Sequence, residues 1–377
     1  MPTPPSPRAE RAEPTGAVTV TAVVVAHHGD RWIPGLRTAL AGQTRPPDTV
    51  VGADTSRPGT DGNDGSLATM QAWLGSDAVA DLPPRTGFGA ALAAALELAP
   101  DADWVWVLHD DCAPGPDALA ELLAEVARDP RVAVAGPKVL GLGDRRLLLE
   151  VGVTIARGGR RETGLERRER DQGQHDGTRA VLAVGTAGML VRRDVWDALG
   201  GLDRRLPLLR DDVDLGWRAN LAGHRVVVVP AAVVHHAEAG SHRRRPVDVA
   251  GGRLHRLDRQ HALFVLLANQ PLARLVIALP WLTVATLLRA LALLAGKRPA
   301  HAAAETWALL ATVGRPDRLL RARLARRRTR QLPARSAMPL LAPRSAGVRH
   351  AMEGLSVFLG TREGLAGAGR HRALHAT

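Results

Sequence analysis

Tyrosine is absent from this 377-residue chain, cysteine occurs once, at Cys112, and lysine occurs only at Lys138 and Lys297. A single cysteine excludes an intramolecular disulfide and fits a reducing compartment. We interpret Cys112 as a small packing residue, because no partner base can be assigned to activate its thiol. Aromatic residues make up only 3% of the chain. We therefore expect no aromatic-lined basic groove for single-stranded nucleic acid, and no nucleic-acid partner.

Apolar runs long enough to cross a membrane are missing, because charges interrupt them. Residues 260–273 and 275–288 carry no formal charge, but Arg274 separates them and Arg289 closes the second. A bilayer span needs about 20 apolar residues, so these segments fit packed helices or helices in the membrane interface. With Arg289 reaching the head groups, residues 274–294 are just long enough to span.

Positive charge exceeds negative charge, and nearly all of it is arginine. Lysine plus arginine number 50 and aspartate plus glutamate 38, a formal net charge of +12. Part of this excess follows a general bias towards Ala, Arg, Gly and Pro, and the rest favours an anionic membrane face or a phosphorylated substrate. Residues 315–330 predict a basic amphipathic helix on anionic lipid or, equally, a solvated surface helix.

Short apolar strands and helices alternate along the first 140 residues. The predicted strands are 17–29, 49–54, 78–80, 104–108 and 132–136, and the predicted helices are 32–42, 66–74, 89–98 and 116–128. This alternation is typical of a mostly parallel sheet with crossover helices. Residues 140–180 are charged and Gly-rich, which favours an exposed hairpin or lid. Later strands are predicted at 181–191, 225–229 and 233–236, and later helices at 194–199 and 211–222.

Composition divides the chain into four parts. Residues 1–16 lack the apolar core of a secretion signal and predict a disordered lead. Residues 17–250 form the α/β domain, and residues 251–330 form a helical, membrane-associating region. Residues 331–377 predict a flexible basic tail with one short helix near residues 352–359.

Acidic and histidine side chains follow several predicted strands. The apolar strand 104–108 runs into Asp110-Asp111 and a turn at residues 113–116. Two buried carboxylates repel each other, and a cation such as Mg²⁺ or Mn²⁺ would relieve that cost. Open α/β sheets bind ligands outside the carboxyl ends of their strands. The other candidates of this kind are Asp54, Asp211, Asp212, Asp214, His235 and His236; any one of them alone is more often a surface residue or a helix cap.

Eight short segments occur in a recognisable order. They are residues 23–28 (VVVAHH), Gln43-Thr44 with Pro46 or Pro47, 50–56, 85–91 (RTGFGAA), 108–111 (LHDD), 185–193, 200–203 (GGLD) and 211–218 (DDVDLGWR). On these segments, residues 18–270 resemble the family 2 glycosyltransferases, in particular rhamnosyl- and galactofuranosyltransferases. The resemblance implies a GT-A fold, an α/β fold with a mostly parallel Rossmann-like sheet flanked by helices, here followed by C-terminal apolar and basic helices. It also implies inverting transfer from a nucleotide-sugar.

The resemblance assigns roles by position. It implies Asp212 or Asp211 as the catalytic base; Asp54, Arg85, Gly87, His27 and Asp110 in donor binding; Asp111, His109 and His235 as ligands of Mn²⁺ or Mg²⁺; Asp214, Arg218 and Trp217 in acceptor binding or in orienting the base; and Arg243 and Arg259 at the diphosphate. Two positions depart from the family pattern. His109 stands where the DxD motif begins with Asp, which favours Mn²⁺ over Mg²⁺, and Asp211 stands where Glu is usual.

The partners implied are a UDP- or dTDP-sugar, a glycan or lipid-linked acceptor hydroxyl, and an anionic membrane surface. The implied location is cytoplasmic, peripheral or weakly integral at the inner face of the plasma membrane. Because of the departures at His109 and Asp211, a catalytically silent module that binds partners or lipid is an alternative. A nucleotidyl or other phosphoryl transferase is a third, although the missing Walker lysine pattern argues against it.

Overall fold

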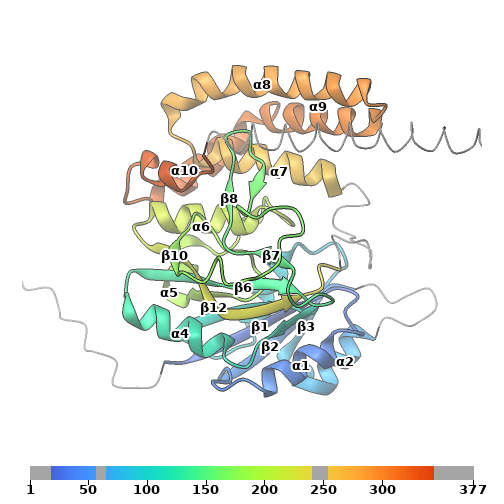
Figure 1. Ribbon diagram of the computed structural model, residues 1–377, viewed down its shortest axis with the longest axis vertical. Coiled ribbons are helices and arrows are strands. Elements are labelled where there is room, and N and C mark those ends of the chain that lie inside the picture. Colours follow the sequence, from blue (N-terminus) through green and yellow to red (C-terminus); the bar gives the residue numbers. More distant parts are fainter. Residues whose placement is uncertain (1–17, 57–64, 240–253, 344–377) are drawn as a thin grey trace, which may run out of the picture.

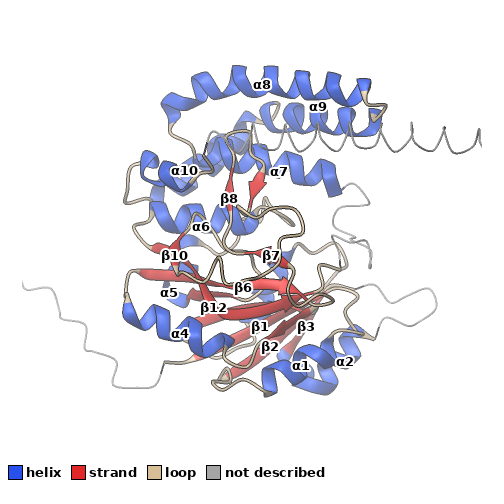
Figure 2. Cartoon of the chain, viewed as in Figure 1, coloured by secondary structure: helices blue, strands red, loops and turns tan. Residues whose placement is uncertain are grey.

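The computed structural model describes residues 18–56, 65–239 and 254–343 (Figures 1 and 2). The predicted lead, the predicted tail helix near residues 352–359 and Arg243 lie outside the described residues. An α/β sheet domain forms the lower part of the view in Figure 1, and C-terminal helices form its upper part. The two parts share buried side chains, as described below.

The large sheet has the strand order β10-β12-β6-β11-β4-β1-β2-β3. In chain order these strands are β1 (Val20–Ala26), β2 (Thr49–Asp54), β3 (Val79–Asp81), β4 (Trp104–His109), β6 (Val132–Gly141), β10 (Arg179–Ala180), β11 (Met189–Arg192) and β12 (Arg225–His236). β1 pairs in parallel with β2 and β4, β2 with β3, and β6 with β12. β11 runs antiparallel between β4 and β6, and the short strands β5 (Cys112–Pro114) and β7 (Leu148–Glu150) are antiparallel to β12 and β6.

Helices cover both faces of this sheet, which is why its central strands are apolar without alternation. All seven residues of β1 are buried, as expected of a parallel strand covered on both sides. Helices α1 (Ile33–Ala41), α2 (Ser66–Leu74) and α4 (Ala118–Arg128) contribute to the core on one face. Helices α3 (Phe88–Leu96), α5 (Arg193–Leu199) and α6 (Asp211–Leu221) contribute to the core on the other. The predicted α/β class with a mostly parallel sheet is confirmed.

The last strand differs from its prediction. The sequence predicted two strands divided at Pro230, but the structure joins them in the single strand β12. The pairing of β12 with β6 is irregular between Val229 and Val233, and such irregularities are where a proline is tolerated inside a sheet. The predicted strand 181–191 is also shorter, since only its last part lies in β11. Residues 140–180 contain the predicted hairpin, formed by β8 (Thr154–Ile155) and β9 (Arg161–Glu162).

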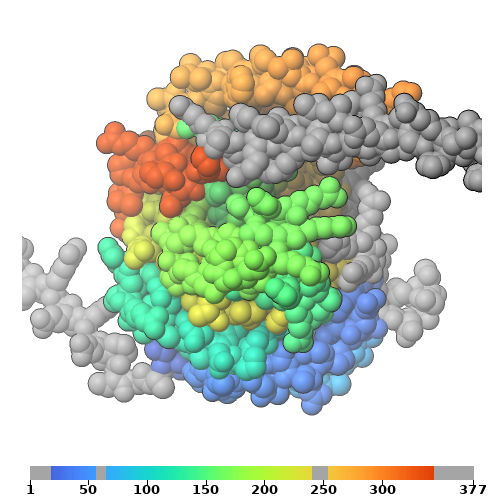
Figure 3. Space-filling model, in the orientation of Figure 1, coloured from blue at the N-terminus to red at the C-terminus, as the bar shows by residue number. Residues whose placement is uncertain are grey.

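The C-terminal helices form a layered extension of the sheet domain. They are α7 (Leu254–Asn269), α8 (Leu272–Ala295), α9 (Pro299–Val313) and α10 (Pro316–Thr329), followed by the 3-10 helix η3 (Ala334–Leu340). Leu263 and Leu267 of α7 share a core with Trp217 of α6, so the extension and the sheet domain are continuous. α8 lies along α9 (Figure 1) and forms the top of the view in Figure 3. Only Leu282, Thr286 and Ala290 of α8 are buried.

Candidate active site

The carboxyl ends of β1, β2, β4, β6 and β12 meet at one edge of the sheet, because these strands run in the same direction. A cavity of about 260 Å³ opens at this edge. Its walls come from the end of β4 (His109), the end of β12 (His236) and the start of α6 (Asp211 and Asp212). The topology therefore brings into one cavity His109 and His236, which lie 127 residues apart.

Four potential metal ligands gather beside this cavity. One ligand atom each from His109, Asp111, Cys112 and His236 lies within 4.8 Å of all the others. His236 Nε2 is 3.0 Å from Asp111 Oδ1 and 3.3 Å from His109 Nδ1. β5 pairs with β12 so that Cys112 lies directly opposite His236. This set of two imidazoles, a carboxylate and a thiol is chemically suited to a divalent transition metal.

His236, and not the predicted His235, takes part in this group. Neighbouring residues of a strand point to opposite faces of the sheet, so only one of the two histidines can approach Asp111. The irregular pairing upstream in β12 sets which one it is. His235 faces other surroundings, where burial lowers the pKa of its ring and the charge of Arg145 adds to the effect.

Asp110 is fully buried at the end of β4 and holds the loop that follows β1. Its Oδ2 accepts a hydrogen bond of 2.9 Å from the His27 amide N–H. A side chain on Gly29 would collide with it, since an added Cβ would lie 2.1 Å from that oxygen. The His27 ring in turn lies 3.0 Å from the Thr55 carbonyl oxygen through Nδ1. These two predicted donor-binding residues thus join the ends of β1, β2 and β4.

The remaining predicted donor-binding residues flank the same edge. Asp54 ends β2, is buried, and accepts a hydrogen bond of 2.6 Å from the Ser56 hydroxyl. Arg85 is exposed in the turn before α3. At Gly87 an added Cβ would lie 2.7 Å from Pro207 Cα, so glycine is needed for the loop before α6 to approach α3 this closely.

Asp211 and Asp212 are the first two residues of α6 and line the cavity. Asp212 accepts hydrogen bonds from Arg161 Nη2 (3.0 Å) and from the Val213 amide N–H (2.7 Å). Asp211 has no such cationic partner, and its Oδ2 has no hydrogen-bond partner among the described residues. Burial, reinforced by the neighbouring charge of Asp212, raises the pKa of Asp211 to about 7. The two carboxylates therefore differ in electrostatic environment although they are adjacent.

The turn that leads into this acidic pair is strained. Leu209 and Arg210 adopt the left-handed region with φ of 65° and 69°, a conformation that costs energy for residues other than glycine. Arg210 is fixed by two hydrogen bonds to Asp258 of α7, at 2.6 and 2.8 Å. Thus α7 holds the turn in the shape that directs Asp211 and Asp212 to the cavity.

The predicted orienting residues lie behind the cavity in the protein core. Asp214 is completely buried and accepts hydrogen bonds from Arg218 (2.7 Å), Arg326 (2.6 Å) and Asn269 (2.9 Å). Burial alone would raise the pKa of Asp214, but the two arginines hold it well below its usual range. Trp217 is fully buried among α7 and C-terminal residues. None of the three predicted orienting residues lines the cavity.

Arg259, predicted at the diphosphate, is used in packing. It forms an ion pair of 2.9 Å with Glu305 of α9 and donates a hydrogen bond of 2.7 Å to the Gly158 carbonyl oxygen. It does not line the cavity, and its contacts tie the β8–β9 hairpin to α7 and α9. Arg161 Nη2 also donates a hydrogen bond of 2.7 Å to Glu150 of β7, and both side chains line the cavity. Sequence reasoning did not single out these two residues, because a charged, Gly-rich segment gives no local signal that its side chains will reach the cavity.

Comparison with known proteins identifies the family. Residues 17–251 match the family model described as "Glycosyltransferase like family 2". The chain belongs to this family. The matched residues contain the whole sheet, the candidate metal ligands and the acidic pair, so the resemblance predicted from sequence is confirmed. Family membership and sheet topology together agree with the predicted GT-A fold.

Similar proteins include two mycobacterial glycosyltransferases. The chain is 32% identical over 158 residues to N-acetylglucosaminyl-diphospho-decaprenol L-rhamnosyltransferase of Mycobacterium tuberculosis, covering 39% of this chain and 50% of that protein. It is 29% identical over 248 residues to galactofuranosyltransferase GlfT1 of Mycolicibacterium smegmatis, covering 64% and 77%. The chain thus spans about half the length of the first of these relatives. Among solved structures, the mannosyltransferase PcManGT from Pyrobaculum calidifontis in complex with GDP-Man and Mn²⁺ is 19% identical, with a TM-score of 0.43 over 82% of this chain and 90% of that one.

Proposed function

We propose that this family 2 glycosyltransferase is an inverting enzyme that moves a sugar from a UDP- or dTDP-sugar to a hydroxyl of a cell-envelope glycan or lipid-linked acceptor. One observation carries the proposal: potential metal ligands (His109 and His236) and an acidic pair (Asp211 and Asp212) line the same cavity of about 260 Å³. Single displacement at an anomeric carbon needs both functions on opposite sides of one sugar. The similarity to the mycobacterial N-acetylglucosaminyl-diphospho-decaprenol L-rhamnosyltransferase supports a lipid-linked acceptor.

On the donor side, His109, Asp111 and His236 would hold a divalent ion, and Cys112 lies close enough to join them. When bound, such an ion offsets the charge that develops on the leaving diphosphate. Two imidazoles favour Mn²⁺ over Mg²⁺, which prefers oxygen ligands. The amide N–H of Ala239 donates to Asp111 Oδ2 at 2.9 Å and so fixes the orientation of this carboxylate. Asp54 would accept hydrogen bonds from the base of the nucleotide, as its place in the family pattern implies.

On the acceptor side, we assign the general base to the pair Asp211 and Asp212. The family pattern favours Asp212, whereas the electrostatics favour Asp211. A base works best when its pKa lies near the working pH, and the pKa of Asp211 is raised to about 7. Asp212 already accepts a hydrogen bond from Arg161, which occupies part of the acceptor capacity of its carboxylate.

We further propose that α8 rests on an anionic membrane. By length and composition α8 is able to cross a membrane, yet little of it is buried. Ile277, Trp281, Val284, Leu288 and Leu291 follow one another at intervals of four and three, so they share one face of the helix, and all are at least half exposed.

Contacts favour a helix lying in the interface over one that spans. α8 is held lengthwise by α9, so a membrane-crossing α8 would have to separate from it or take it along. Arg274 near one end of α8, and Lys297 and Arg298 just beyond the other, could reach lipid phosphates while the apolar face inserts. Charge complementarity therefore selects an anionic bilayer as the occupant of this surface.

Nucleotide binding tests the catalytic proposal. We expect UDP or dTDP to raise the melting temperature of the full chain when Mn²⁺ is present and not when EDTA is present, because ligand binding stabilises the folded state. Sugar transfer from the matching donor to a lipid-linked acceptor, followed by NMR of the anomeric proton, then tests inversion. Metal-dependent nucleotide binding without transfer to any acceptor would favour the silent module, and absence of nucleotide binding would overturn the proposal.

A further inference from the structure

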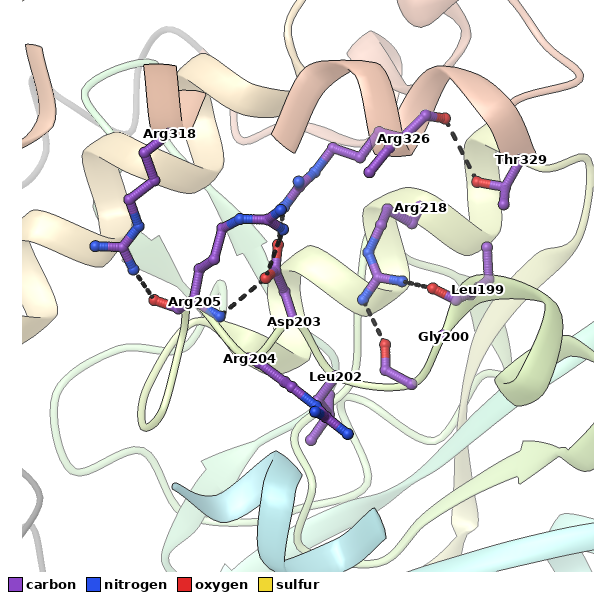
Figure 4. Close-up of a pocket in the computed structure, with 12 residues that line it drawn as sticks. Leu199, Gly200, Leu202, Asp203, Arg204, Arg205, Arg218, Arg318, Arg326 and Thr329 are labelled. Atoms are coloured by element: carbon purple, nitrogen blue, oxygen red, sulfur yellow. Dashed lines mark hydrogen bonds and ion pairs between the residues drawn. The ribbon is translucent and has the colours of Figure 1, made fainter. Parts of the chain in front are cut away.

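A second cavity, of about 520 Å³, lies between α10 and the segment 199–205 that follows α5 (Figure 4). It shares no lining residue with the active-site cavity. The two cavities are nevertheless linked by α6, because Arg218 lines the second cavity and Asp211 the first. Seven residues of α-helix separate these two positions by about 10 Å along the axis.

Arginine dominates the walls of this cavity. Its charged lining residues are Arg204, Arg205, Arg218, Arg318 and Arg326, against the single carboxylate of Asp203. These residues come from three separate elements, namely the segment after α5, α6 and α10. Leu199, Leu202 and Ala325 add an apolar part to the wall.

Two of the five arginines have their charge compensated by the protein. Arg218 pairs with Asp214 and donates to the carbonyl oxygens of Leu199 and Gly201, at 2.8 and 2.7 Å. Arg326 pairs with Asp214 and Asp203, at 2.6 and 2.9 Å. Figure 4 shows the guanidinium group of Arg218 directed at Leu199 and that of Arg326 directed at Asp203. The protein itself therefore occupies the N–H groups of these two arginines, and they are not available to a ligand.

The other three arginines have side-chain N–H groups with no hydrogen-bond partner among the described residues. Arg205 pairs with Asp203 through Nη1 at 3.1 Å. The same carboxylate also pairs with Arg326. Arg318 donates through Nη2 to the Arg205 carbonyl oxygen at 2.7 Å, an uncharged partner. Among the described residues, the structure gives Arg204 no hydrogen bond or ion pair. Burial lowers the pKa of Arg318; the carboxylate of Asp203 opposes this effect, and the positive charges of Arg205 and Arg315 add to it.

We propose that this cavity is a second anion site that binds the phosphate group of a phosphate ester or diphosphate through Arg204, Arg205 and Arg318. Guanidinium groups match the oxygens of phosphate in paired, charge-assisted hydrogen bonds. The volume exceeds that of one phosphate ion and leaves room for an attached organic group against Leu202. The ligand chemistry is shared by a phospholipid head group and by a soluble phosphate compound. The site goes beyond the proposed function, since sugar transfer does not require it.

Titration with inorganic pyrophosphate tests the site directly. The full chain is titrated calorimetrically in EDTA, which removes metal-dependent binding at the active site. We expect Arg204→Gln combined with Arg318→Gln to weaken pyrophosphate binding at least tenfold. The matched control is Arg327→Gln combined with Arg328→Gln, which removes two exposed charges from α10 outside the cavity. Arg204→Gln alone, at an exposed position without partners, gives a smaller loss in the same direction without any risk to folding.

Two results would overturn the site: equal weakening in the test and control variants, which would indicate diffuse attraction to a basic helix, or no pyrophosphate binding by the unaltered chain. Vesicles distinguish the source of the phosphate. If it is a lipid head group, the Arg204→Gln, Arg318→Gln chain also binds phosphatidylglycerol vesicles less tightly than the control chain does. If it is a soluble compound, vesicle binding is the same in both chains while pyrophosphate binding still falls. Neither readout uses catalysis, so failure of the proposed transferase activity would leave the result interpretable.

Discussion

Arg326 of α10 donates a hydrogen bond of 2.6 Å to Asp214 of α6, in the buried core and across 112 residues of sequence. Asp214 lies three residues after Asp211, so the C-terminal extension is attached directly to the helix that carries the acidic pair. The region predicted from sequence as membrane-associating therefore also supports the candidate active site. This relationship determines which variants can test each role separately.

We expect Arg326→Met to destabilise the chain. Breaking a buried ion pair by removing one partner costs about 3–5 kcal/mol, because it leaves the other charge buried with fewer partners. Urea denaturation should show a lower midpoint for this variant. Arg327→Met removes an exposed neighbouring charge and should change the free energy of unfolding by less than about 0.5 kcal/mol. Similar midpoints for the two variants would show that the pair contributes no net stability.

Metal binding should depend on His236 and not on His235. We expect His236→Ala and Asp111→Asn each to lower the affinity for Mn²⁺ at least tenfold, because the first removes a ligand atom and the second removes the negative charge of another ligand in the group that includes His109. Electron paramagnetic resonance of free Mn²⁺ during a titration measures this affinity without requiring turnover. His235→Ala is the matched control, because it removes one imidazole from the preceding position of β12. A larger effect of His235→Ala would restore the ligand set predicted from sequence.

The distinction between these two histidines shows where sequence reasoning ends. The order of motifs predicted the sheet, the family and the strand end that carries Asp110 and Asp111, because each depends on local patterns. Which of two adjacent histidines reaches Asp111 depends on the irregular pairing of β12 with β6, between Val229 and Val233. Pro230 marks the position of this irregularity in the sequence, but no local residue pattern gives the register beyond it.

Contacts between residues far apart in the sequence could not be predicted either. Arg161 donates a hydrogen bond to Asp212, 51 residues further along the chain. Arg259 forms an ion pair with Glu305 and does not line the cavity. A charged hairpin and a basic helix look alike in sequence whether their arginines face solvent, a carboxylate or a substrate. Only the packing of α7 and α9 on the sheet domain separates these cases.

Asp211 should make stability fall as the pH rises. Its pKa is about 7 in the folded chain against an ordinary value of 3.8, so between these values the folded state binds more protons than the unfolded state, and stability decreases with rising pH. We expect Asp211→Asn to raise the melting temperature by several degrees at pH 8, with a difference that disappears towards pH 4. Calorimetry at a series of pH values measures this, and a constant difference would contradict the assignment.

The same pKa predicts the pH dependence of transfer. If Asp211 is the base, kcat/KM should rise with pH through about 7 as its carboxyl ionises. Asp211→Asn should then abolish transfer while nucleotide affinity is kept. Asp212→Asn should retain a rise with pH, at a lower pH than in the unaltered chain, because the neighbouring charge that raises the pKa of Asp211 is lost. If Asp212→Asn is instead the inactive variant and Asp211→Asn transfers sugar, the base is Asp212, as the family pattern implies.

Membrane binding should depend on the exposed face of α8. We expect Ile277→Ser, Leu288→Ser and Leu291→Ser together to weaken binding to phosphatidylglycerol vesicles at least tenfold, because burying each such side chain contributes about 1.5–3 kcal/mol. Sedimentation with vesicles measures this. Leu320→Ser with Leu324→Ser is the control, since both leucines are exposed on α10. Deleting residues 315–377 would not be a clean test, because it also removes Arg326 from Asp214. Equal binding of the α8 variant and the control would show that α8 does not enter the lipid, and its apolar face would then have to be covered by something other than a bilayer.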